Sequence, residues 1–122
     1  MQSKVIRVML VDDHTLVRES LADVLGREAD VEVVGQAGDG VEALELARQL
    51  RPEVVLMDIS MPRMNGLEAT RRLKAEMPDT RVIGLSMHSS PEMLDAMQAA
   101  GASQFLTKGC SVPSLLSAVR GE

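Results

Sequence analysis

Five polar residues of this sequence share one kind of position, because each stands at or just after the end of a short apolar run. Their side chains are three carboxylates, one hydroxyl and one amine, carried by Asp12, Asp13, Asp58, Ser86 and Lys108. If the apolar runs are parallel strands of an open α/β sheet, ligands bind outside the carboxyl ends of those strands. The five side chains would then meet in one crevice, although they lie far apart in the sequence.

The three carboxylates point to a bound cation. Clustered carboxylates cannot all stay ionised unless a positive charge offsets their repulsion. A hard divalent ion with oxygen ligands, such as Mg²⁺, would do so. Simpler interpretations stay open at this stage, since one Asp of the Asp12-Asp13 pair would suffice to cap the following helix. Asp58 could likewise be an ordinary loop carboxylate, and Lys108 a solvated surface residue.

The strands and helices that would position these residues alternate along the chain. Apolar runs predict strands over Val5–Val11, Val31–Ala37, Val54–Met57, Val82–Leu85 and Gln104–Leu106. Apolar residues at helical spacing, with proline at helix starts or just past their ends, predict helices over Thr15–Arg27, Gly40–Leu50, Asn65–Met77, Pro91–Ala100 and Val112–Arg120. Five such strand–helix units predict a doubly wound α/β fold, with a parallel sheet covered on both faces.

Composition narrows the class of protein. The chain has 122 residues, of which 45% are hydrophobic, so we expect a single domain over residues 1–122 with a sizeable core. The net charge of −5 argues against nucleic-acid binding by this domain itself. The sequence has no apolar stretch of the roughly 18 residues needed to span a membrane and no signal-peptide pattern. A single cysteine, Cys110, fits a cytoplasmic protein, with the thiol as a buried or half-buried apolar group.

The motifs at the strand ends together resemble the receiver domain of bacterial two-component response regulators. The resemblance runs from about residue 5 to 120, on Val11-Asp12-Asp13-His14, Met57-Asp58-Ile59-Ser60-Met61-Pro62 with Asn65-Gly66, Leu85-Ser86, and Gly101-Ala102 through Phe105-Leu106-Thr107-Lys108. The details are most similar to the NarL/FixJ subfamily, whose full-length members usually carry a LuxR-type helix-turn-helix domain after the receiver. The resemblance implies a flavodoxin-like (βα)5 fold with strand order 2-1-3-4-5.

The resemblance also implies a role for each residue. Asp58 matches the aspartate that accepts a phosphoryl group, so the protein would be a phospho-accepting switch rather than an ordinary enzyme. The matches to the ligands of Mg²⁺ are Asp12, Asp13, Asp58 and the backbone carbonyl of Ser60. Lys108 matches the amine that contacts a phosphoryl oxygen. Ser86 matches the switch hydroxyl and Phe105 the switch aromatic, although simple core packing also explains Phe105.

The implied partners follow from the same resemblance. They are a sensor histidine kinase that donates the phosphoryl group, a second copy of the chain on phosphorylation, and DNA reached through a C-terminal domain outside residues 1–122. The output would then be control of transcription. A stand-alone receiver that acts through protein–protein contacts is the alternative. We expect His14 and His88 to be surface residues, because a Mg²⁺ site is made of oxygen atoms, while His88 could also tune dephosphorylation.

Two other classes of α/β protein fit the sequence less well. Phosphatases of the haloacid-dehalogenase type carry an Asp-x-Asp nucleophile motif after the first strand, whereas Asp12 and Asp13 are adjacent. A nucleotide- or flavin-binding domain would need a glycine-rich loop after the first strand. The only similar segment, Gly38-Asp39-Gly40, follows the second strand and lacks the third glycine. The isomer of the Lys108–Gly109 peptide bond stays open, because many receivers have proline after the matching lysine.

Overall fold

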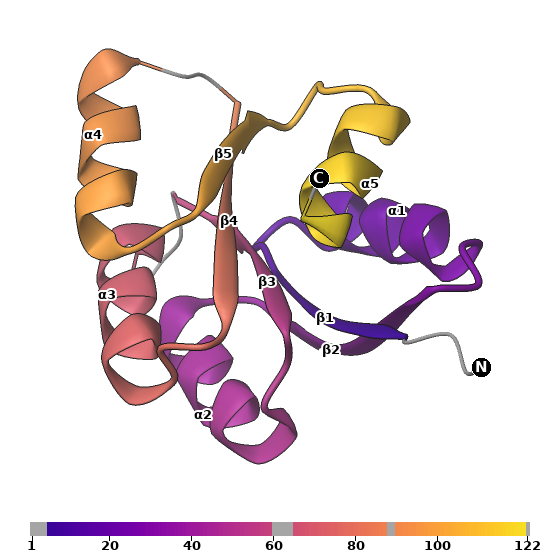
Figure 1. Ribbon diagram of the computed structural model, residues 1–122, viewed down its shortest axis with the longest axis horizontal. Coiled ribbons are helices and arrows are strands. Elements are labelled where there is room, and N and C mark those ends of the chain that lie inside the picture. The colour runs from indigo at the N-terminus through magenta and orange to yellow at the C-terminus, as the bar shows by residue number, and fades with distance from the viewer. Residues whose placement is uncertain (1–4, 60–64, 88–89, 122) are drawn as a thin grey trace.

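Five parallel strands form the central layer of the structure, a computed structural model that describes residues 5–59, 65–87 and 90–121 (Figure 1). The sheet has the order β2-β1-β3-β4-β5, which confirms the predicted topology. The strands are β1 (Ile6–Val11), β2 (Val31–Ala37), β3 (Val54–Asp58), β4 (Arg81–Ser86) and β5 (Gln104–Thr107). The helices are α1 (Thr15–Gly26), α2 (Gly40–Leu50), α3 (Gly66–Glu76), α4 (Pro91–Ala100) and α5 (Val112–Arg120).

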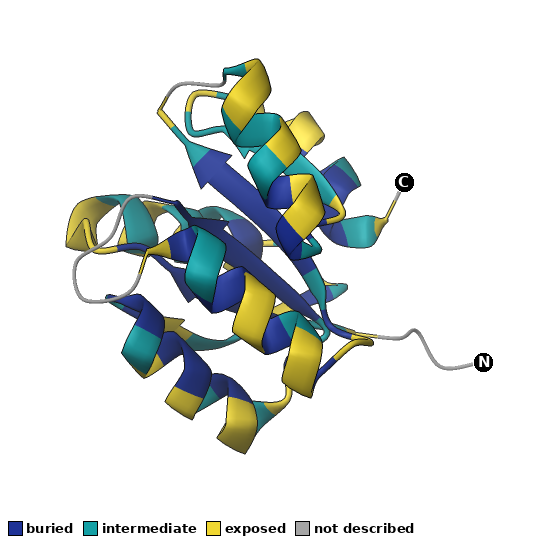
Figure 2. Ribbon diagram, turned by 90° about the vertical axis from the view of Figure 1, so that its left-hand side faces the viewer, coloured by how far each residue is buried: buried dark blue, intermediate teal, exposed yellow. Residues whose placement is uncertain are grey.

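The helices cover both faces of the sheet, with α1 and α5 on one side and α2, α3 and α4 on the other (Figure 1). Successive strand residues therefore enter different cores. In β1, Val8 and Leu10 pack with α1 and α5, whereas Met9 and Val11 pack on the opposite side. Figure 2 shows the matching pattern on the helices, whose buried residues face the sheet and whose exposed residues face outward. Both cores are almost wholly aliphatic, and Phe105 packs at the edge of the second one.

Three strands extend one residue further than their apolar runs. Asp58, Ser86 and Thr107 are the last residues of β3, β4 and β5, and each is paired in register with a neighbouring strand. The predicted ends were wrong here because backbone pairing continues past the last apolar side chain. Asp58 and Ser86, two of the predicted site residues, are thus held by the sheet itself, on adjacent strands, rather than by a loop.

Helix α3 begins at Gly66, one residue later than predicted, because Asn65 is its N-cap. The Asn65 side chain accepts a hydrogen bond from the backbone N–H of Glu68 at 3.0 Å. The backbone N–H of Gly66 donates to the carbonyl of Ile59 at 2.8 Å. A Cβ atom on Gly66 would lie 2.2 Å from the carbonyl oxygen of Asp58. Only glycine therefore lets the start of α3 approach the end of β3 so closely.

This close approach predicts the effect of Gly66→Ala. The new methyl group would collide with backbone atoms that cannot move without displacing Asp58, so we expect a loss of about 2–3 kcal/mol in the free energy of unfolding, measured by urea denaturation. Gly26→Ala is the matched control, since a Cβ there meets nothing within 4 Å. It should stabilise the protein by about 0.4–1 kcal/mol. Equal effects of the two substitutions would contradict the proposed packing.

Candidate functional site

Three carboxylates and one imidazole gather at the carboxyl ends of β1 and β3. Asp12, Asp13, His14 and Asp58 each offer one ligand atom, and these atoms lie within 4.8 Å of one another. The side chains of Asp12 and Asp58 are almost fully buried, that of Asp13 is 31% exposed and that of His14 is 65% exposed. The cluster therefore has a buried floor made by two carboxylates and an open rim made by Asp13 and His14.

Lys108 supplies the positive charge of the buried floor. Its Nζ atom lies 2.8 Å from Asp12 Oδ2 and 3.3 Å from Asp58 Oδ1, and only 8% of its side chain is exposed. The backbone N–H of Lys108 donates to the carbonyl of Ser86 at 2.7 Å, which fixes the residue against the end of β4. The interpretation of Lys108 as a solvated surface residue is thereby excluded.

The carboxylate of Asp12 does not act as the N-cap of α1. The N-cap is His14, whose side chain makes no capping hydrogen bond. Asp12 Oδ1 instead accepts a hydrogen bond from the backbone N–H of His14 at 2.8 Å, two residues further along the chain. This turn directs the backbone from β1 into α1 and holds the carboxylate at the mouth of the sheet.

Burial and charge shift the pKa values of the two groups that face each other across the site. Burial, reinforced by the nearby Asp12 carboxylate, raises the pKa of Asp58 to about 6, although Lys108 opposes the shift. Burial disfavours the charged form of Lys108, but the carboxylates of Asp12 and Asp58 outweigh it and raise the pKa of the amine. One ammonium group thus offsets two buried carboxylates only in part, and Asp13 adds further negative charge.

One buried carboxylate oxygen, Asp58 Oδ2, has no hydrogen-bond partner within the described residues. Asp12 Oδ2 has no partner there besides the Lys108 ammonium group at 2.8 Å. Buried polar atoms without a partner are uncommon in native proteins. A hard divalent cation such as Mg²⁺ binds oxygen ligands, and the negative charge of these carboxylates is offset only in part. The residues present therefore fit such an ion.

The other predicted site residues lie around this cluster or outside the described part of the chain. Ser86 is half-buried at the end of β4, next to the strand that carries Asp58. Phe105 is half-buried in β5, one strand further along the sheet. Ser60 and His88 fall outside the described residues.

Sequence reasoning underestimated His14. The residue is exposed, as expected, but its Nδ1 atom lies 3.2 Å from Asp12 Oδ1 and 3.3 Å from Asp13 Oδ1. The adjacency of His14 to the Asp12-Asp13 pair was the only available signal. Two smaller points are resolved as well. Asp39 of the Gly38-Asp39-Gly40 segment is simply the N-cap of α2, and no peptide bond of the described ranges is cis, which makes Lys108–Gly109 trans.

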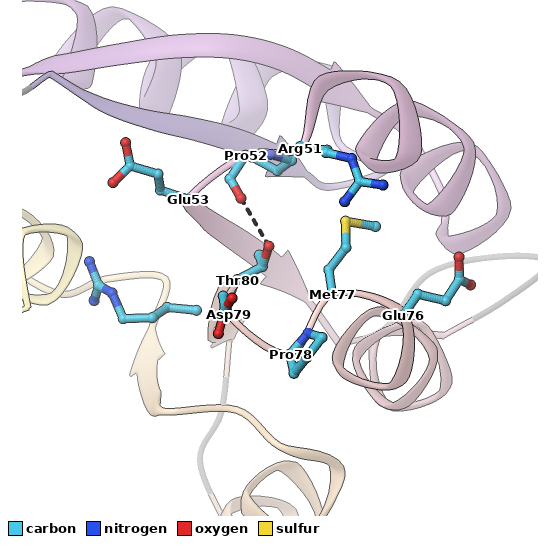
Figure 3. Close-up of a pocket in the computed structure, with 9 residues that line it drawn as sticks. Arg51, Pro52, Glu53, Glu76, Met77, Pro78, Asp79 and Thr80 are labelled. Carbon is cyan, nitrogen blue, oxygen red and sulfur yellow. Dashed lines mark hydrogen bonds between the residues drawn. The ribbon is translucent and has the colours of Figure 1, made fainter.

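A second hollow lies at the opposite end of the sheet, between the loops that precede β3 and β4 (Figure 3). Its wall is held together by the hydroxyl of Thr80, which donates to the carbonyl of Pro52 at 3.0 Å, as Figure 3 shows. The charged residues around it are of both signs, among them Arg51, Glu53 and Asp79. Unlike the site at the carboxyl ends, this hollow contains no cluster of converging acidic ligands among the described residues.

Comparison with known proteins assigns this fold and acidic site to a class. The sequence matches the model of the response regulator receiver domain over residues 8–120, so the chain belongs to this family. It is therefore a signalling domain of two-component systems and not an enzyme in the usual sense. The match confirms the family expected from the strand-end motifs.

The relatives of the chain include response regulators and transcriptional regulatory proteins. The chain is 42% identical to the response regulator GacA of Pseudomonas viridiflava over 94% of this chain and 54% of that protein. It is 40% identical to the transcriptional regulatory protein DegU of Brevibacillus brevis, over 94% and 49% respectively. The chain thus spans about half the length of these curated relatives.

Solved structures agree with this placement. The signal receiver domain of the response regulator NarL from Mycobacterium tuberculosis is similar with a TM-score of 0.88 and 35% identity, covering 98% of this chain and 99% of that one. A two-component response regulator of the LuxR family from Aurantimonas gives a TM-score of 0.92 and 34% identity, covering 97% and 84%.

The raised pKa of Asp58 predicts that Asp58→Asn stabilises the metal-free protein at pH 8. The folded-state pKa of about 6 exceeds the ordinary value of 3.8, so ionised Asp58 destabilises the fold above pH 6. We expect a gain on the order of 2 kcal/mol at pH 8 in EDTA, from urea denaturation. The gain should shrink as the pH falls from 6 towards 4 and vanish below about pH 3, where the carboxyl is protonated in both the folded and the unfolded state.

The control for this substitution is Asp79→Asn. Asp79 is exposed at the opposite end of the sheet, so its replacement should change the free energy of unfolding by less than about 0.5 kcal/mol at any of these pH values. A gain for Asp58→Asn that did not depend on pH would show that relief of a buried charge is not its cause.

Proposed function

We propose that Asp58 is the phosphoryl acceptor of this receiver domain and that a phosphohistidine of a sensor histidine kinase is the donor. The carrying observation is the buried carboxylate of Asp58, which pairs with Lys108 through Oδ1 while Oδ2 accepts no hydrogen bond within the described residues. In the proposed transfer, a carboxylate oxygen forms a bond to phosphorus as the phosphorus–nitrogen bond breaks. The leaving imidazole takes up a proton, and the product is an aspartyl phosphate.

A divalent ion, Mg²⁺, is proposed as the cofactor of this transfer. The residues that would hold it are Asp12, Asp13 and Asp58. The family resemblance adds the backbone carbonyl of Ser60, which lies outside the described residues. Bound there, Mg²⁺ would offset the charge of the transferring phosphoryl group. Asp13 is the most exposed of the three carboxylates and so the most accessible to an ion that arrives from solvent.

Lys108 is proposed to follow the charge as it moves. Before transfer, its ammonium group lies between the carboxylates of Asp12 and Asp58. After transfer, the single charge of Asp58 is replaced by a phosphoryl group that carries about two negative charges. An ammonium group already within 3.3 Å of Asp58 needs little movement to contact a phosphoryl oxygen.

Ser86 and Phe105 are proposed to carry the signal from the site to the surface. Ser86 is paired in register with Thr107, which ends the short strand that also holds Phe105. The ring of Phe105 lines a cavity with Leu94 and Met97 of α4. Movement of the Ser86 hydroxyl toward the phosphoryl group would shift the end of β4. The cavity would then allow the Phe105 ring to change position.

Control of transcription is the proposed output, in the cytoplasm. The curated relatives named above, a response regulator and a transcriptional regulatory protein, are about twice as long as this chain, which supports a further domain beside the receiver. We propose that this domain follows the receiver and binds DNA, and that two phosphorylated copies pair. The alternative is a stand-alone receiver that acts through protein–protein contacts. Within the described ranges, no helix is long and apolar enough to cross a membrane.

Covalent labelling tests the proposed acceptor. With acetyl phosphate and Mg²⁺, the protein should gain one phosphoryl group at Asp58, located by borohydride trapping and mass spectrometry. EDTA should suppress the labelling, because the repulsion between the donor and the acidic cluster is then not offset. Asp58→Asn should take up no label, whereas Asp79→Asn should be labelled like the wild type. Undiminished labelling of Asp58→Asn would refute the assignment.

Replacement of Ser86 by alanine should separate phosphorylation from its conformational effect. Ser86→Ala should still be labelled at Asp58, because the hydroxyl is neither the nucleophile nor a metal ligand. Loss of one hydrogen bond to a charged group removes roughly 1.5–3 kcal/mol, which lowers the active-to-inactive ratio about 10- to 150-fold. NMR shifts of α4 and α5 with the phosphoryl mimic beryllofluoride would measure this ratio. A full wild-type response of Ser86→Ala would assign the switch to another group.

A further inference from the structure

Within the described residues, the imidazole of His14 is the only group of the acidic cluster that could bind a metal ion through nitrogen. Its Nδ1 atom lies 3.2 Å from Asp12 Oδ1 and 3.3 Å from Asp13 Oδ1. The backbone of His14 is fixed, because its N–H donates to Asp12 Oδ1 at 2.8 Å. The ring itself is 65% exposed, so it can reach an ion that enters from solvent while its backbone stays in place.

The distances from His14 Nδ1 to the Asp12 and Asp13 oxygens match those between neighbouring ligand atoms around one metal ion. In octahedral coordination with bonds of roughly 2.1 Å, adjacent ligand atoms lie about 3 Å apart. The distances from Nδ1 to the two carboxylate oxygens are only slightly longer than that. The buried oxygen Asp58 Oδ2, which has no hydrogen-bond donor within the described residues, independently indicates that this cluster awaits a ligand.

We propose that His14 is a nitrogen ligand of the divalent ion at this site. The inference rests on the metal site described under the proposed function and adds a consequence for the choice of metal. Imidazole is a good ligand for Co²⁺, Ni²⁺ and Zn²⁺, whereas Mg²⁺ strongly prefers oxygen. The site therefore binds transition-metal ions more tightly than an all-oxygen cluster would, and His14 determines that selectivity.

The test compares two ions on three proteins. Isothermal titration measures the affinity of Co²⁺ and of Mg²⁺ for the wild type, for His14→Ala and for His88→Ala, which removes the other histidine of the chain. We expect His14→Ala to weaken Co²⁺ binding by about tenfold or more, with little change for Mg²⁺. His88→Ala should leave both affinities near the wild-type values.

A direct spectroscopic reading accompanies the titrations. In proton NMR of the Co²⁺-loaded protein, a ring bound directly to the ion gives strongly shifted resonances, and an exchangeable one among them is split when histidine is labelled with ¹⁵N. These resonances should be present in the wild type and in His88→Ala and absent in His14→Ala. Circular dichroism of His14→Ala should match the wild type, because the ring is exposed and packs in neither core.

The possible results separate this inference from the proposed function. Wild-type protein that binds Co²⁺ without shifted histidine resonances, and His14→Ala that loses affinity for both ions equally, would overturn the inference. The imidazole would then only orient the carboxylates through hydrogen bonds, and the proposed phosphoryl acceptor would stand. Failure of the wild type to bind either ion would overturn the inference together with the proposed metal site.

Discussion

One buried ammonium group, that of Lys108, makes it possible for two buried carboxylates to share the mouth of the sheet. Its contacts to Asp12 and Asp58, at 2.8 and 3.3 Å, are the only contacts with a lysine or arginine that the described residues provide for either carboxylate. Loss of the amine would leave two uncompensated buried charges, which is strongly destabilising. The strand register that brings the ends of β1, β3 and β5 together is therefore also what makes the buried acids tolerable.

The opposite end of the sheet is built on a different electrostatic principle. There, arginine side chains bind backbone carbonyls at the carboxyl ends of helices, where the helix dipole is negative. Arg7 donates to the carbonyls of Leu50 and Arg51 at the end of α2, and Arg81 donates to two carbonyls near the end of α5. Arg7 and Arg81 are thus satisfied by helix carbonyls. At the acidic end, one ammonium group offsets two buried carboxylates only in part, which favours the binding of a cation there.

Much of this arrangement could be predicted from the sequence, because the apolar runs fixed both the strand count and the edge to which their carboxyl ends point. That edge places Asp12, Asp13 and Asp58 on the same side of the sheet, whereas the adjacency of β1 and β3 was implied only by the family resemblance. The ends of β3 and β4 could not be predicted, since backbone pairing continues through polar Asp58 and Ser86. The sharing of Lys108 and the placement of the His14 ring depend on side-chain rotamers in three dimensions, which spacing along a chain does not encode.

The incomplete neutralisation of the site connects its stability to its chemistry. An aspartate that attacks phosphorus must be ionised, yet burial beside Asp12 raises the pKa of Asp58 to about 6 and makes its ionised form unfavourable. A cation at the rim would relieve this repulsion and favour the reactive carboxylate. Phosphorylation of Asp58, as proposed, would add negative charge at the same point. The two states of the domain would then differ most in the negative charge that Lys108 and a cation at the rim have to offset, and that difference would be the free energy available to move β4 and β5.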